Sequence, residues 1–142
     1  MRMSSSKWLV PVVTSLAIVL AAIATLLLAA HPAVVGCPGS SVSGGLIDCG
    51  AVVSSPGGKI LGLPLGGWAL LWLFLYWLGR VAWRGRLLSV IATLGFLGVA
   101  YAVGTELRVG HVCAWCTLVQ LSIVTLGVWS LVTNRVKVQD HG

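Results

Sequence analysis

The sequence has 142 residues, of which 58% are hydrophobic, and its charged side chains are nine Lys or Arg and three Asp or Glu. A soluble domain of this size could not bury so much apolar surface, so the composition excludes an ordinary globular protein. The net charge of +6 does not indicate binding to nucleic acid, because the basic residues lie in small groups beside hydrophobic segments rather than in one patch.

Four apolar segments are long enough to cross a bilayer, since a transmembrane helix needs roughly 20 consecutive apolar residues. They cover residues 8–30, 66–83, 87–106 and 112–133, and the connection at 31–65 is the one long loop. We therefore expect an all-α integral membrane protein, with residues 1–142 forming a single domain: a four-transmembrane-helix bundle with a long extracytoplasmic loop. Glycines in the third segment are typical of close helix–helix approach in lipid: Gly95, Gly98 and Gly104.

The basic residues predict the orientation. Most of them flank the termini or the turn between the second and third segments: Arg2, Lys7, Arg80, Arg84, Arg86, Arg135 and Lys137. Only Lys59 and Arg108 fall in the other two connections. The positive-inside rule then places both termini in the cytoplasm and the loop at 31–65 outside a plasma or inner membrane.

The first segment has a second interpretation, as a cleaved signal peptide, because basic residues precede it and small residues follow near Ala30 and Ala33. The apolar run at 8–30 is longer than the roughly 7–15 residues usual in a signal peptide. We therefore favour a retained span, and the long loop lies outside in either case.

All four cysteines fall on the outer side under this topology, where disulfides form and persist. Within Cys113-Ala114-Trp115-Cys116 the two sulfurs are three residues apart at a helix start, which puts them within disulfide reach. The positive end of the helix dipole stabilises a thiolate there. In the loop, Asp48 predicts an N-cap for a short interfacial helix near 51–55 with Cys49 at its start. Cys37 lies in flexible Gly- and Pro-rich sequence that could carry its sulfur between two partners.

Two other interpretations of the cysteines stay open. Structural disulfides could staple the loop and the fourth helix, but a CxxC disulfide closes only a few residues and restrains little chain entropy. A zinc site usually pairs one CxxC with another, whereas Cys37 and Cys49 are widely spaced and the outer compartment favours oxidation. We favour redox exchange and expect no metal.

Three residues near the CxxC pair each have an interpretation that requires no catalytic role. His111 could shuttle a proton, but an interfacial histidine without a special role is the commoner case. Trp115 is typical of an interface anchor. Glu106 is ionisable near the end of a span, and Arg108 is close enough in sequence to neutralise it.

The order of these features resembles the vitamin K epoxide reductase family: a first span, an outer loop with two cysteines, a short helix ending in serines, and a CxxC opening a later span. The matching stretches are Cys37, Asp48-Cys49-Gly50-Ala51-Val52-Val53-Ser54-Ser55, Gly62-Leu63-Pro64 and Cys113-Ala114-Trp115-Cys116-Thr117. The resemblance covers nearly the whole chain and is to bacterial-type members without a fused thioredoxin domain.

This resemblance implies a four-helix bundle around a quinone pocket that the outer loop caps. It implies that a thioredoxin-like partner reduces the Cys37–Cys49 pair and that Cys49 then attacks the disulfide between Cys113 and Cys116. The Cys116 thiolate would reduce the quinone, which could be a menaquinone, a ubiquinone or a vitamin K type.

The resemblance also implies cofactor-binding residues. Ser55 matches the serine that family members place by the quinone pocket. Val53 stands where vertebrate enzymes have an aromatic residue, and Gln120 stands where they have a tyrosine. Gln120 could donate a hydrogen bond to a quinone carbonyl from inside the bundle, since an amide facing lipid is costly.

The predicted function is therefore quinone-dependent oxidation of a thioredoxin-like partner, which supports disulfide formation in exported proteins. The direction follows from potentials, because quinones lie well above protein dithiols. Two alternatives are reduction of vitamin K epoxide by the same sulfurs and a non-enzymatic membrane protein with structural disulfides.

Overall fold

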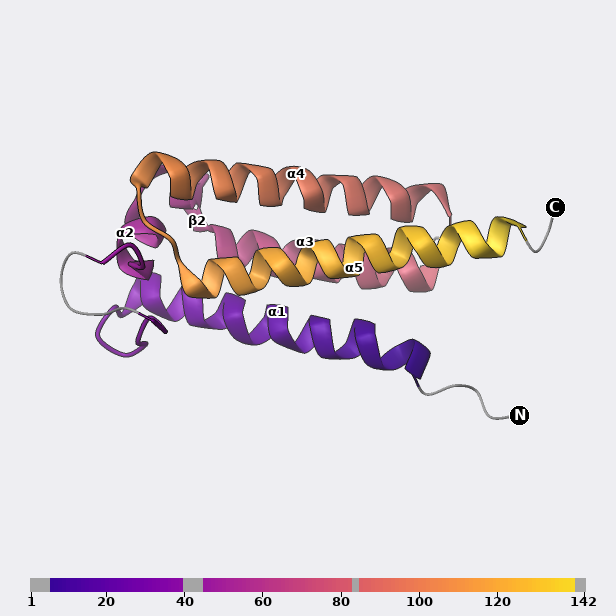
Figure 1. Cartoon of the computed structure of the whole chain (residues 1–142), viewed down its shortest axis with the longest axis horizontal. Coiled ribbons are helices and arrows are strands. Elements are labelled where there is room, and N and C mark those ends of the chain that lie inside the picture. The colour runs from indigo at the N-terminus through magenta and orange to yellow at the C-terminus, as the bar shows by residue number, and fades with distance from the viewer. Residues whose placement is uncertain (1–5, 40–44, 83–84, 140–142) are drawn as a thin grey trace.

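Four long helices run along one another in the computed structural model, and short elements gather at one end (Figure 1). The structure describes residues 6–39, 45–82 and 85–139. The helices are α1 (Ser6–Ala30), α3 (Leu65–Ala82), α4 (Arg86–Val109) and α5 (Ala114–Gln139), and each contains a stretch long and apolar enough to cross a membrane. The expected fold class, an all-α membrane protein with four long apolar helices, is confirmed. Arg2, Trp83, Arg84 and the loop residues 40–44 lie outside the described residues.

The ends of the long helices differ from the expected ones by a few residues. α4 continues to Val109, where Gly110 ends it in the left-handed conformation (φ 76°) and donates its N–H to the Glu106 carbonyl. α5 begins at Ala114, later than the predicted start at 112. Cys113 therefore precedes the helix, and its carbonyl accepts the Thr117 N–H at 2.9 Å.

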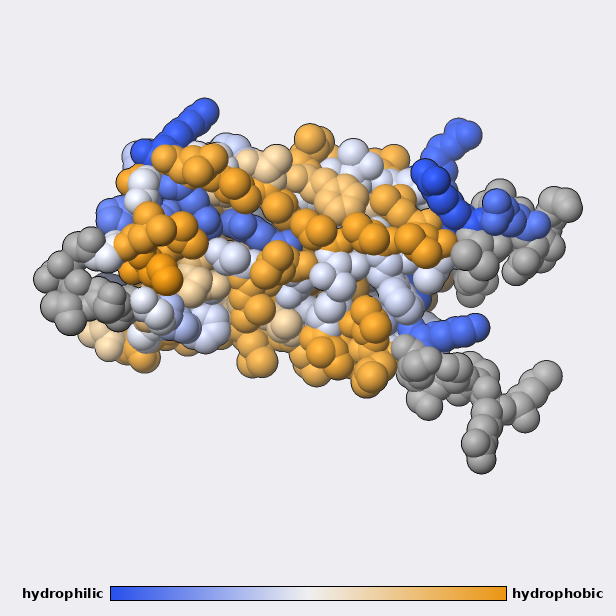
Figure 2. Space-filling view, in the orientation of Figure 1, coloured by the Kyte–Doolittle hydropathy of each residue, from blue (hydrophilic) through white to orange (hydrophobic). Residues whose placement is uncertain are grey.

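The outer faces of the long helices are apolar, as lipid requires. Figure 2 shows hydrophobic side chains over most of the visible length of the bundle, with most of the deep hydrophilic colour at its two ends. Inside, Ile18, Tyr76 and Leu126 are fully buried where the helices meet. Along their length, the helices therefore present apolar side chains both to one another and to lipid. The polar ends of the bundle lie where water is available.

Small residues allow close helix contacts at some of the expected places. A Cβ atom on Gly95 would lie 2.8 Å from the Trp72 ring, so this glycine is required by packing. The expectation of close approach is wrong for Gly98 and Gly104, because a Cβ at either position would meet no atom within 4 Å. Gly66 at the start of α3 is also required by packing, because a Cβ there would collide with Thr25 of α1.

The capped end is built from α2 (Cys49–Ser54), the 3-10 turn η1 (Pro56–Gly58) and a hairpin of β1 (Lys59–Ile60) with β2 (Leu63–Pro64). The Asp48 carboxylate accepts the Ala51 N–H at 3.0 Å, which is the predicted N-cap. These elements lie at the end opposite to the start of α1 and the end of α5 (Figure 1). The loop therefore covers one mouth of the bundle.

Candidate active site

The four cysteines form two disulfides at the capped end. Cys37 is bonded to Cys49 with the Cα atoms 5.7 Å apart, and Cys113 is bonded to Cys116 with the Cα atoms 5.1 Å apart. In each pair the backbone N–H of the later cysteine points at the sulfur of the earlier one, at 3.2 Å. Such an N–H stabilises the negative charge of a thiolate once the disulfide is reduced.

Burial divides the cysteines into an inner and an outer set. Cys49 and Cys113 have no exposed surface and belong to one apolar cluster with Leu28, Val52 and Val53. Cys37 and Cys116 are half-buried at the margin of that cluster. One cysteine of each disulfide therefore keeps some exposed surface, and the other is enclosed in the cluster that both disulfides share.

A short backbone bridge joins the two cysteine segments. Ile47 and Val112 form an isolated parallel β-bridge, in which the Val112 N–H donates to the Leu46 carbonyl at 2.8 Å and the Asp48 N–H donates to the Val112 carbonyl at 3.0 Å. The bridge comes directly before Cys113 and just before Cys49. The bridge fixes the start of α2 beside the start of α5. No spacing pattern in the sequence predicts it.

Trp115 adds a second connection between the same segments. Its indole N–H donates to the Gly36 carbonyl at 2.9 Å, next to Cys37. The expectation that this side chain is only an interface anchor is therefore incomplete, because it also ties the CxxC helix to the outer loop. His111 is half-buried, and its Nδ1 atom has no hydrogen-bond partner among the residues that the structure describes.

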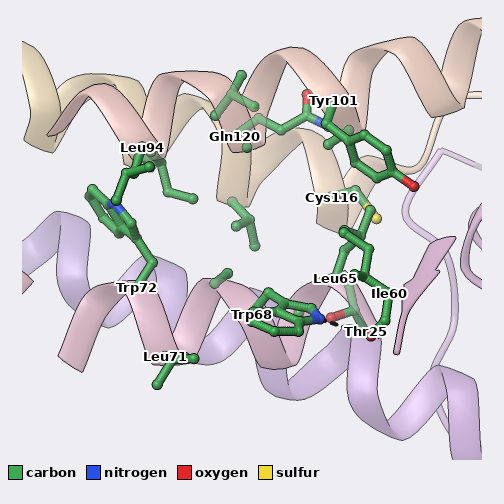
Figure 3. Close-up of a pocket in the computed structure, with 18 of the residues that line it drawn as sticks. Thr25, Ile60, Leu65, Trp68, Leu71, Trp72, Leu94, Tyr101, Cys116 and Gln120 are labelled. Atoms are coloured by element: carbon green, nitrogen blue, oxygen red, sulfur yellow. Dashed lines mark hydrogen bonds between the residues drawn. The ribbon is translucent and has the colours of Figure 1, made fainter. Parts of the chain in front are cut away.

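Below the cysteines lies a cavity of about 400 Å³. Figure 3 shows Cys116 at one end of it with Thr25, Ile60 and Leu65, and Leu71, Trp72 and Leu94 at the other. Its walls come from all four long helices and from β1. Small-molecule sites measure roughly 300–1,000 Å³, and roughly 150 Å³ suffices for a benzene ring, so the cavity can hold a substituted ring system.

Hydrogen bonds hold the aromatic walls of this cavity in place. The Trp68 indole donates to the Ile60 carbonyl at 3.1 Å, and the Trp72 indole donates to the Ile91 carbonyl at 2.8 Å. Tyr101 completes the aromatic lining from α4. Sequence reasoning missed these three residues, because nothing in a uniformly apolar span distinguishes an aromatic ring that faces a cavity from one that faces lipid.

Gln120 is the predicted cofactor-binding residue that lines the cavity. It is 8% exposed, and its Nε2 donates to Glu106 Oε1 at 2.9 Å. The expectation that Arg108 neutralises Glu106 is wrong in this structure, because the carboxylate is bonded to the Gln120 amide instead and the Arg108 side chain is exposed.

The other two predicted cofactor residues lie away from the main cavity. Val53 is buried in the cysteine cluster and borders a separate void of about 10 Å³ that Cys116 also lines. The Ser55 hydroxyl donates to the Val52 carbonyl at 2.7 Å and accepts the Gly58 N–H at 3.1 Å, so it caps η1. The structure thus brings Gln120 and Cys116 together and gives Ser55 a capping position.

No group of three or more His, Cys, Asp or Glu side chains is placed to hold a metal ion within residues 6–39, 45–82 and 85–139. Among family models, the one described as the vitamin K epoxide reductase family matches residues 8–131, which is most of the chain. Curated proteins and solved structures give no match.

Proposed function

Because the chain belongs to the vitamin K epoxide reductase family, we propose that it oxidises a thioredoxin-like protein outside the membrane and reduces a membrane quinone. Family membership makes it an oxidoreductase with thiol–disulfide chemistry, and the four long apolar helices make it a multi-pass membrane protein. The quinone, the partner and the orientation are the proposed parts. The product is a disulfide in the partner, which supports folding of exported proteins.

The observation that carries the proposal is the order of the sulfurs from the loop to the cavity. Cys37 is accessible in the loop, Cys49 and Cys113 share the buried cluster, and Cys116 lines the cavity. Thiol–disulfide exchange requires contact between sulfur atoms and proceeds through mixed disulfides. Two disulfides that share one buried cluster, the second with a cysteine at an apolar cavity, fit electron transfer from a protein thiol to a lipid-soluble ring.

The loop pair accepts electrons in the first steps. The partner dithiol reduces the Cys37–Cys49 disulfide, which leaves two thiols on the loop and a disulfide on the partner. The Cys49 thiolate attacks Cys113, the Cys113–Cys116 bond breaks, and the Cys116 thiolate is released beside the cavity. The Cys37 thiolate then attacks Cys49, which re-forms the loop disulfide and frees Cys113.

The CxxC pair completes the cycle. As a dithiol, Cys113 and Cys116 hold two electrons and two protons, which is the amount needed to convert a quinone to its hydroquinone. Their loss re-forms the Cys113–Cys116 disulfide. The apolar lining of the cavity excludes water from this step, and Gln120 offers a polar group to a ring carbonyl.

The opposite end of the bundle has the features of a membrane–water interface. The Arg80 guanidinium lies over the rings of Trp8 and Trp77, at 5.3 and 6.0 Å from their centroids, and donates to the Tyr76 hydroxyl at 3.2 Å. Arginine among aromatic rings is typical of a membrane–water interface. This end also has most of the basic residues, so the positive-inside rule places it in the cytoplasm and the cysteines outside.

Purified protein in lipid, supplied with dithiothreitol and a soluble quinone, tests the proposal through the rate of quinone reduction. We expect Cys116→Ala to abolish turnover, because this sulfur is the one beside the cavity. Cys37→Ala should spare turnover driven by dithiothreitol while it lowers turnover driven by a thioredoxin-like protein. A Cys116→Ala protein with full activity would reject the assignment, and equal losses from both donors in Cys37→Ala would reject the relay.

A further inference from the structure

Glu106 is the one acidic residue within the four long helices, since the other two acidic residues of the sequence are Asp48 and Asp140. It is only 8% exposed. An ionisable group inside a membrane bundle is costly and is found where it has a partner or a function. The reaction steps proposed above do not use it.

The partner of Glu106 is a residue of the cavity wall. Glu106 Oε1 accepts the Gln120 Nε2 at 2.9 Å, and this is the hydrogen bond that the described residues provide to the Gln120 side chain. Gln120 lines the cavity one helical turn after Cys116, whereas Glu106 does not line it. The carboxylate therefore lies outside the cavity lining and is bonded to the amide of a residue that belongs to it.

The chemistry of the two groups determines which way the amide points. The terminal torsion of a glutamine is broad, so an unanchored amide can present either its oxygen or its nitrogen. A carboxylate only accepts hydrogen bonds, so the amide nitrogen must face Glu106. The second N–H of this amide has no partner among the residues that the structure describes. A quinone carbonyl also only accepts, and the free N–H matches it.

We propose that Glu106 is a positioning residue that holds the Gln120 amide so that its second N–H is donated to a quinone carbonyl. This inference rests on the proposed quinone reduction. It assigns the hydrogen bond to the ring to a buried pair of side chains between α4 and α5.

The first test compares quinone kinetics of Glu106→Leu, Gln120→Ala and the double variant with those of the unaltered protein. We expect Glu106→Leu to raise the KM for a soluble quinone about five-fold, as for loss of one hydrogen bond between neutral groups. Because Glu106 acts through Gln120, the double variant should be no worse than Gln120→Ala alone. Additive losses in the double variant would overturn the inference.

Two conservative variants separate positioning from a merely structural role. Glu106→Gln keeps a hydrogen bond between the helices but can donate as well as accept, so it no longer fixes the orientation of the Gln120 amide, and its KM should rise, though by less than in Glu106→Leu. The exchanged pair, Glu106→Gln with Gln120→Glu, keeps a bond between the helices but turns an acceptor toward the cavity, and it should raise the KM as much as Gln120→Ala. An exchanged pair with the original KM, or a Glu106→Gln protein with the original KM, would overturn the inference.

A thiol measurement keeps the two proposals distinct. Reduction of the Cys113–Cys116 disulfide by dithiothreitol without quinone, followed by alkylation, should be the same in all variants, because Glu106 does not touch these sulfurs. If the unaltered protein fails to reduce quinone, the proposed function fails. If it turns over and Glu106→Leu has an unchanged KM, only the positioning role fails.

Discussion

Gly98 offers a direct way to test whether the cavity beside Cys116 is the quinone site. It lines the cavity, and a Cβ at this position would meet no atom within 4 Å, so a larger side chain can grow into the space without displacing the helices. Gly98→Leu adds four carbon atoms to a cavity of about 400 Å³. These atoms occupy room that a ring system of similar size would need.

The magnitude follows from the ligand contacts that the leucine displaces. A drug-sized ligand gains about 0.3 kcal/mol per non-hydrogen atom, so the loss of about four atoms of contact corresponds to about 1.2 kcal/mol. Since about 1.4 kcal/mol is a factor of ten, the KM for the quinone should rise roughly seven-fold. The same change removes a helix-interior glycine, which stabilises α4 by about 0.5–1 kcal/mol.

Gly104 provides the matched control. It lies in the same helix, also has open space around its Cβ, and does not line the cavity. Gly104→Leu should therefore gain the same helix stability and leave the quinone KM unchanged. The assay is the initial rate of quinone reduction against quinone concentration at saturating dithiothreitol. Equal KM values for the two variants would refute the reasoning that this cavity binds the ring.

Two further predictions concern the contact between the loop and the CxxC helix. Trp115→Phe removes the hydrogen bond to Gly36 but keeps an aromatic ring, and the loss of about 1 kcal/mol should slow turnover driven by a thioredoxin-like protein about five-fold while turnover with dithiothreitol persists. Identical rates with the protein donor would show that this connection does not align the sulfurs. Asp48→Ala removes the N-cap of α2 at a cost of about 1 kcal/mol, so Cys49 in reduced protein should be alkylated about five-fold faster. Asp48→Asn keeps an acceptor oxygen and should restore slow alkylation, and equally fast alkylation in both would contradict the capping role.

The parts of the fold that a sequence can predict are those imposed by the bilayer and by local chemistry. Hydropathy predicts the four spans because the hydrocarbon requires long apolar helices in which every backbone group is bonded. Asp48 predicts the start of α2 because an N-cap is a local interaction. The CxxC spacing predicts that Cys113 and Cys116 are within reach of each other for the same reason.

The rotation of each helix about its axis is not predictable in this way. In α3, Leu73 is 6% exposed and Leu71 is 46% exposed, although both are leucines in one apolar span. Water normally marks the outer face of a helix with polar residues, but lipid accepts the same side chains as the protein interior. The aromatic walls of the cavity and the Glu106–Gln120 pair depend on these rotations, so they required the structure.

The position of the CxxC pair at the start of α5 explains how the two cysteines of one disulfide can contact different parts of the protein. Cys113 precedes the first helical residue and is enclosed with Cys49 in the cluster below α2, whereas Cys116 belongs to the first turn and lines the cavity. Two sulfurs within bonding distance thus face different neighbours, because the chain changes from extended backbone at Val112 to helix between them. Under the proposed function, electrons pass from the loop cluster to the cavity when this bond breaks and re-forms. The same feature explains why the Ile47–Val112 bridge matters, since a shift of the extended segment would move Cys113 away from Cys49 while Cys116 stayed with the helix.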